Sequence, residues 1–118
     1  MKVREAVERI DSLVRNTYTR EEKLFWLSNL DAQIAAVVLD GEPPSPYKDD
    51  EDLDQDLLVE APFDMMYIHW LEAQIAYTNG EIDRYNNAMA MFNQDVDGYN
   101  RYRLRHKNQK NVTTIKYF

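Results

Sequence analysis

Cysteine is missing from this chain of 118 residues, and glycine and proline are scarce. Without cysteine there is no disulfide, no thiol nucleophile and no thiolate metal site, which agrees with synthesis in a reducing cytoplasm. No stretch reaches the roughly 20 apolar residues that span a bilayer. The charged start, Met1 to Glu5, lacks the apolar core of a signal peptide. We therefore expect a soluble protein that is not exported.

The scarcity of glycine and the long runs of helix-favouring residues predict a single all-α domain of four helices. A net charge of -7 disfavours general nucleic-acid binding, because a polyanion is repelled at long range. The acidic and basic residues are nevertheless separated along the chain, since every acid precedes residue 98. The basic residues that follow are Arg101, Arg103, Arg105, Lys107, Lys110 and Lys116.

Two helices are expected before residue 40. The first covers 3–14, with an apolar stripe that includes Val3, Ile10 and Leu13. The second begins at Thr19, where Thr19 to Glu22 has the form of a capping box, and it ends at Asp40 and Gly41. The expected apolar face of this second helix consists of Leu24, Leu27, Leu30, Ile34 and Val37.

Residues 40–60 predict an exposed, mobile loop of about twenty residues, because closely spaced prolines exclude a helix and like charges repel one another. Leu57 to Val59 would attach its far end to the core. The acidic run could contact a basic surface on a neighbouring molecule. The acidic residues of this loop are Asp49, Asp50, Glu51, Asp52, Asp54 and Asp56.

The alternation of aspartates in this loop is similar to a calcium-binding EF-hand loop, but two signature features fail. Gln55 stands where the turn glycine belongs, and Ala61 stands where the bidentate glutamate belongs. We therefore interpret the run as a solvated loop and expect no bound metal.

Residues 61–106 predict a long αα-hairpin with its turn at Asn79 and Gly80. Pro62 suits the first turn of the first helix, and Gly80 readily adopts the left-handed conformation that ends a helix. The first apolar seam contains Met65, Ile68, Leu71 and Ile75. The second contains Ile82, Tyr85, Met89, Phe92, Val96 and Tyr99.

Residues 107–118 predict a basic tail, extended from Val112 because its last residues favour β structure. The tail could be solvated, could bind nucleic acid with nearby tyrosines such as Tyr102, or could dock on another protein by strand addition. Docking is the interpretation we favour. The candidate docking residues are Arg101, Arg103, Arg105, Lys107, Lys110, Val112, Ile115, Tyr117 and Phe118.

No constellation typical of catalysis is found. His69 and Glu72 lie three residues apart, but a di-iron bundle needs the reverse order in two copies. The serines lie in no nucleophile elbow, and there is no glycine-rich phosphate loop. We expect neither an enzyme nor a cofactor.

The predicted hairpin is rich in aromatic residues, which could thicken the core or form a subunit interface. Both interpretations can hold for different rings. The candidate interface residues are Tyr67, Trp70, Tyr77, Tyr85, Tyr99 and Tyr102.

Several stretches resemble the head-tail connector proteins of long-tailed bacteriophages and prophages. They are YTREEKLFWLSNLD at 18–31, PFDMMY at 62–67, AQIAYTNGE at 73–81 and DRYNNAMAMFN at 83–93. The resemblance implies a non-enzymatic structural protein that assembles as a ring of about a dozen copies on the portal, where a heterologous interface joins the subunits. It also implies a portal contact through the C-terminal segment.

The same resemblance implies a tail or head-closure protein as a further partner and DNA passing through the ring without sequence-specific binding. The location would be the head-tail junction of the virion, after synthesis in the bacterial cytoplasm. Two other functions remain open from the residues alone: a small acidic regulator that binds one protein, or a nucleic-acid-binding module that uses the basic C-terminal segment.

Overall fold

The computed structural model describes the backbone of residues 1–115 and the side chains of residues 1–106. Within this part of the chain the fold is all-α, without strands, as the sequence predicts. Its four helices are α1 (Val3–Leu13), α2 (Arg20–Gln33), α3 (Met65–Asn79) and α4 (Ile82–Ile115). A π-helical segment, η1 (Ile34–Val38), continues α2.

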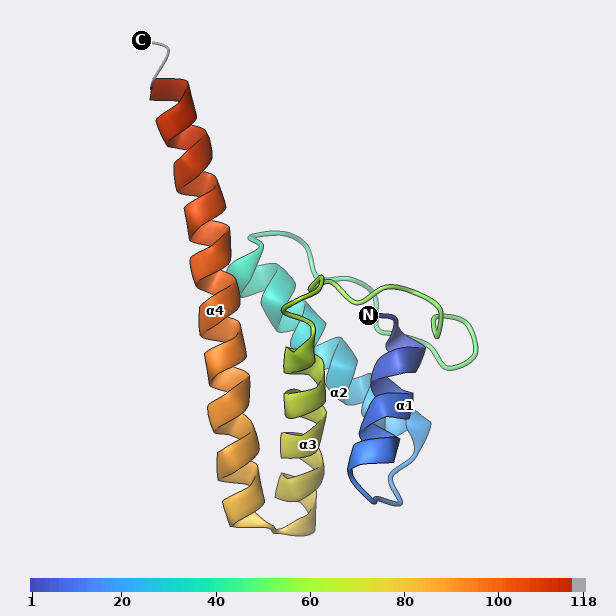
Figure 1. Cartoon of the computed structure of the whole chain (residues 1–118). Coiled ribbons are helices and arrows are strands. Elements are labelled where there is room, and N and C mark those ends of the chain that lie inside the picture. The colour runs from blue at the N-terminus through green and yellow to red at the C-terminus, as the bar shows by residue number, and fades with distance from the viewer. Residues whose placement is uncertain (116–118) are drawn as a thin grey trace.

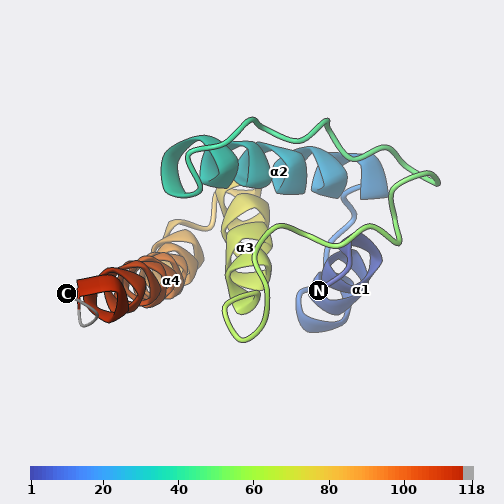
Figure 2. The ribbon, with the colours of Figure 1, turned by 90° about the horizontal axis from the view of Figure 1, so that it is seen from above.

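Three of the helices lie side by side, with α3 between α1 and α4, and α2 crosses one side of this row, as Figure 2 shows. The closest helix pair is α3 and α4, which form the predicted hairpin. Because α4 is much longer than α3, its C-terminal part extends beyond all the other helices (Figure 1). The chain therefore consists of a body and a projecting helical end.

The centre of the body is α3, which is covered on almost every side. Of its predicted apolar seam, Ile68, Leu71 and Ile75 are buried. The α4 seam is only partly buried, since Phe92 and Tyr99 are in the core but Ile82 is 70% exposed. The buried residues of α3 are Met66, Tyr67, Ile68, Leu71, Ala73, Ile75 and Ala76.

The hairpin turns at Gly80, which adopts the left-handed conformation with φ of 75°. Its N–H donates to the carbonyl of Tyr77 at 3.1 Å, and the N–H of Glu81 donates to the carbonyl of Ala76 at 2.8 Å. These bonds satisfy carbonyls that a helix end leaves without partners. The predicted stop at Gly80 is confirmed.

Gly80→Ala is expected to lower the free energy of unfolding by about 1 kcal/mol, because an L residue adopts the left-handed conformation only at a cost. Gly98→Ala is the matched control. Gly98 lies inside α4, where an added Cβ meets no other atom within 4 Å, and alanine is favoured over glycine in a helix by about 0.5–1 kcal/mol. Urea unfolding should therefore shift in opposite directions for the two variants; equal shifts would contradict this account.

The start of α2 confirms a predicted helix cap, whereas the end of α1 corrects one residue of a predicted apolar stripe. Thr19 caps α2, with its hydroxyl oxygen accepting from the N–H of Glu22 at 3.2 Å. Leu13, predicted as part of the apolar stripe of the first helix, is 63% exposed. It is the last residue of α1, whose buried residues are Val3, Ala6, Val7 and Ile10.

Val37 was expected on the buried face of the second helix but is 82% exposed. The reason is the π-helical segment η1, in which each turn contains an extra residue and the face rotates. Val38 packs against the core in place of Val37.

The start of α3 corrects another expectation. Pro62 does not open the helix but lies in the turn before it, and α3 begins at Met65. The N–H of Phe63 donates to the carbonyl of Glu60 at 3.0 Å. This turn places the ring of Phe63 against Tyr99 and Tyr102 of α4, with centroid separations of 5.4 and 4.9 Å.

The extended tail predicted from residue 107 is replaced by helix up to Ile115. Adding a residue to an existing helix forms one more hydrogen bond without a new nucleation step, so α4 propagates through residues with only modest helix propensity. No strand lies in the described part of the chain to pair with an extended segment. The predicted docking side chains beyond residue 106, including Val112, Ile115, Tyr117 and Phe118, lie outside the described side chains.

Candidate interaction surfaces

A closed polar cluster joins the long loop to the helices. Asp31 of α2 is fully buried. One of its carboxylate oxygens accepts from the hydroxyl of Tyr47 and from the N–H of Leu58 at 3.2 Å. The other accepts from the hydroxyl of Tyr67 at 2.6 Å, and that hydroxyl in turn accepts from the N–H of Val59 at 2.8 Å. The cluster therefore links α2, α3 and both halves of the loop.

Burial raises the pKa of the Asp31 carboxyl above its ordinary value of 3.8, although its hydrogen bonds act in the opposite direction. Burial and the neighbouring carboxylate also raise the pKa of the Tyr47 and Tyr67 hydroxyls. Both tyrosines therefore stay protonated and donate to Asp31. Because these groups are enclosed and mutually satisfied, their role is to hold the loop in place.

The acidic loop is held by arginines of its own chain. Arg20 contacts Asp49 at 2.6 Å and Asp50 at 3.1 Å, and Arg4 contacts Asp54 at 3.3 Å. These pairs are largely exposed, so each contributes at most about 1 kcal/mol. They nevertheless direct the aspartates toward different partners, and in the described side chains no group of three or more potential ligands could hold a metal ion.

The loop is less exposed than its composition predicts, because four of its apolar side chains are buried. Leu57 and Val59 attach its far end, as expected, while Tyr47 and Leu53 attach its middle. The N–H of Arg4 also donates to the carbonyl of Leu53 at 2.8 Å. The sequence pattern missed these attachments because single aromatic or leucine residues in an acidic run carry no periodic signal.

The aromatic residues proposed for an interface separate into core and surface. Tyr67 and Tyr99 are buried within the chain. Trp70 is half-buried and donates its indole N–H to the carbonyl of Trp26 at 3.0 Å. Tyr77 is 70% exposed.

The remaining rings lie along α4. Tyr85 is half-buried against Tyr77, with ring centroids 5.5 Å apart. Tyr102 is half-buried between Phe63 and His106. Among the six candidate rings, Tyr77 is the one that presents most of its surface for contact with another molecule.

His69 pairs across the hairpin and not along its own helix. Its Nδ1 contacts the carboxylate of Asp95 on α4, so the expected proximity to Glu72 is not the contact that is formed. The pair is half-buried and links the two helices of the hairpin. Spacing within one helix could not reveal a partner on the other.

The projecting end of α4 is exposed and basic. Arg101, Arg103 and Arg105 all lie on the surface, as does Leu104, which is 59% exposed. Between this end and η1 lies an open groove of about 780 Å³. The residues lining the groove include Val37, Val38, Leu39, Asp40, Tyr102 and Leu104. The candidate surfaces are therefore helical faces and a groove between helices.

Comparison of the chain with protein-family models, with curated proteins and with solved structures finds no match. In the part of the chain described by the structure, none of the helices combines the length and apolar character needed to cross a membrane.

Proposed function

We propose that this chain is a structural head-tail connector of a long-tailed phage or prophage, which forms a ring on the portal and joins the DNA-filled head to the tail. The observation that carries the proposal is the hairpin at 62–93. Three of the four stretches that resemble the connector family lie in this hairpin, from the turn before α3 to the first half of α4, and the fourth, 18–31, forms most of α2. The resemblance thus coincides with the structural centre of the molecule.

The distribution of charge supports a role at a junction. All 21 acids precede residue 98, whereas six of the 14 lysines and arginines follow residue 100. An acidic body around a channel would let DNA pass without adhering, and Arg103 with the lysines that follow residue 106 would engage the portal. Since Asp49, Asp50 and Asp54 pair with their own chain, the loop offers fewer free charges to DNA than its composition indicates.

Deleting the gene from the phage or prophage that encodes it is the decisive test. We expect separate heads and tails and no infectious particles, because the junction cannot form. Supplying the wild-type chain in trans should restore particles, and a tagged chain should be located at the head-tail junction by gold labelling in electron micrographs.

Complete, infectious particles that lack the protein would contradict the proposal. If the purified chain then bound DNA with an affinity that falls steeply as salt rises, the nucleic-acid-binding function would replace it. A discrete complex with a single host protein would instead support the regulator.

A further inference from the structure

The outer face of α4 is unpartnered in the described part of the chain and is free of charge over ten of the helix's 34 residues. α4 packs almost entirely on α3, which leaves its other side to solvent. Residues 85–94 contain no charged side chain, although 30% of the chain is charged. The exposed residues in this stretch are Asn86, Asn87, Ala90, Met91, Asn93 and Gln94. Depletion of charge is a mark of surfaces that contact other proteins.

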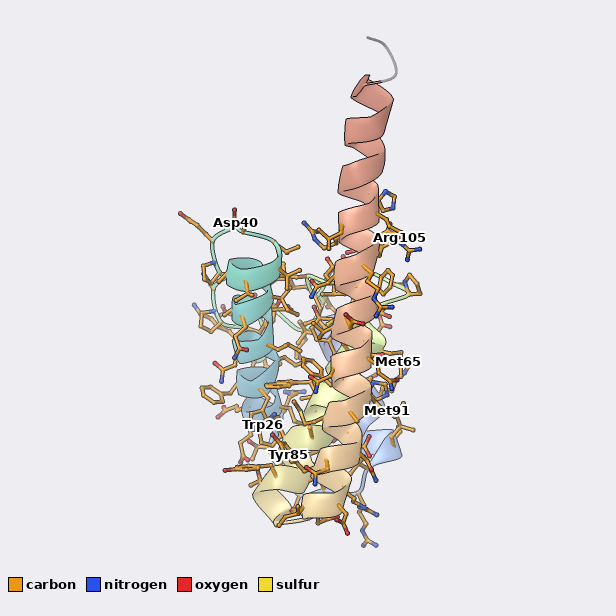
Figure 3. The ribbon with its side chains drawn as sticks, turned by 90° about the vertical axis from the view of Figure 1, so that its left-hand side faces the viewer. Trp26, Asp40, Met65, Tyr85, Met91 and Arg105 are labelled. Carbon is orange, nitrogen blue, oxygen red and sulfur yellow. The ribbon has the colours of Figure 1, made fainter. Side chains whose placement is uncertain are left out.

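The same face of α4 becomes basic toward its C-terminus. Arg101 and Arg105 continue the exposed stripe at a step of four residues, and Asp97, one turn before them, pairs with Arg101 at 2.7 Å. Figure 3 shows Met91 and Arg105 along the same side of α4, the side turned away from α2. The α4 outer face therefore has an uncharged half and a basic half.

The outer face of α2 has the complementary pattern. Glu21 and Glu22 mark its first turn, and Phe25 is 63% exposed beside them. The rest of the stripe is uncharged up to Val37. The exposed residues along it are Glu22, Phe25, Asn29, Gln33, Ala36 and Val37. The α2 outer face therefore has an acidic half and an uncharged half.

We infer that the α4 outer face of one copy packs antiparallel against the α2 outer face of a second copy. In this orientation Arg101 and Arg105 meet Glu21 and Glu22, while the uncharged halves meet each other. A parallel orientation would place the arginines against Val37 and leave the glutamates without basic partners. Charge complementarity therefore favours both a second copy of the chain as the partner and the antiparallel packing of the two helices.

Gly98 would allow a helix of a second copy to approach α4 closely. It belongs to the α4 outer face, and an added Cβ there would meet nothing of its own chain within 4 Å. The fold itself therefore does not require glycine at this position, although glycine weakens a helix interior. A residue without a side chain lets a second helix come near.

The contact joins two different surfaces, so each copy can bind one neighbour through α4 and another through α2. Such a heterologous contact closes into a ring or continues as a filament. The inference rests on the ring of the proposed function for its biological setting, but it requires only that the chain binds itself.

Charge reversal tests the contact on the full-length chain. One variant carries Glu21→Arg and Glu22→Arg, and the other carries Arg101→Glu and Arg105→Glu. We expect each variant alone to associate at least about tenfold more weakly than the wild type, because like charges then face each other. An equimolar mixture should recover assembly, since each reversed face meets a reversed partner. Sedimentation velocity and light scattering measure both effects.

Glu8→Arg with Glu51→Arg is the matched control, because both glutamates are exposed and lie outside the two faces. It makes the same change in net charge as the first variant and should assemble like the wild type. Circular dichroism and thermal unfolding should show all variants folded, as every substituted side chain is exposed.

Absence of cysteine in the chain allows the orientation to be tested separately. A chain with Gln33→Cys and Asn93→Cys should form a ladder of disulfide-linked oligomers, because antiparallel packing brings these positions together. Gln33→Cys with Arg105→Cys should not. The opposite result would overturn the antiparallel contact.

A mixture of the charge-reversed variants that stays monomeric while the wild type assembles would also overturn the inference. So would a wild-type chain that remains monomeric up to about 1 mM, which is the weak end of specific association. Neither result decides the proposed function, since gene deletion tests that role independently.

Discussion

Asp31→Ala is expected to lower the free energy of unfolding by about 2–4 kcal/mol. The alanine would leave the hydroxyls of Tyr47 and Tyr67 and the N–H of Leu58 without their shared acceptor. Loss of this acceptor should also release the loop at 40–60. Urea unfolding measures the first effect, and amide hydrogen exchange of the loop measures the second.

Glu51→Ala is the control, since Glu51 is an exposed acid of the same loop. It should change the free energy of unfolding by no more than about 0.5 kcal/mol. Equal effects of the two substitutions would show that the buried cluster does not hold the loop.

The pH dependence of stability follows from the raised pKa of Asp31. The folded chain keeps the Asp31 proton at a pH where the unfolded chain has already lost it. The stabilisation from this group is therefore complete below 3.8 and is lost as pH rises through the higher pKa of the folded state. Asp31→Asn should remove this component, so the wild type should lose stability relative to the variant across that window.

Leu71→Ala is expected to lower the free energy of unfolding by about 2–5 kcal/mol. Leu71 is fully buried in α3, the helix that contacts each of the other three. The substitution removes apolar contacts and leaves a cavity that close-packed neighbours fill only partly. Thermal unfolding followed by circular dichroism should show one transition at a clearly lower temperature.

Leu13→Ala removes the same atoms from a side chain that is 63% exposed. Its effect should stay near or below about 0.5 kcal/mol. If both substitutions had the same effect, α3 would not be the centre of the core.

The sequence predicted the helices well because their determinants are local. Periodic apolar residues marked the buried side of α1, and Thr19 and Gly80 marked helix ends through hydrogen bonds made within a few residues. The errors occurred where the backbone departs from simple rules. Val37 turns outward in a π-helical turn, and Pro62 belongs to a turn instead of a helix start.

The buried cluster was missed because its members lie far apart in sequence. Asp31 and Tyr67 are 36 residues apart, and Tyr47 lies in a loop without periodicity. One signal was present, since Asp31 directly follows Leu30 on the apolar face expected for the second helix. An acid in such a position needs buried donors, but nothing in the pattern names them.

The burial of the tyrosines could not be predicted for a similar reason. Tyr67 and Tyr77 belong to the same helix, yet one is in the core and the other is 70% exposed. Because α3 is apolar on nearly every side, its sequence does not show which side the other helices leave uncovered.

The length of α4 has a mechanical consequence. Its 34 residues make a rod of about 51 Å at 1.5 Å per residue. Contacts hold this rod from the Gly80 turn as far as Tyr102, which packs on Phe63, so the free end is about 20 Å long. A bend of about 10° where the contacts end would move the tip by about 3 Å, which lets the projecting end adjust to a partner of slightly different shape.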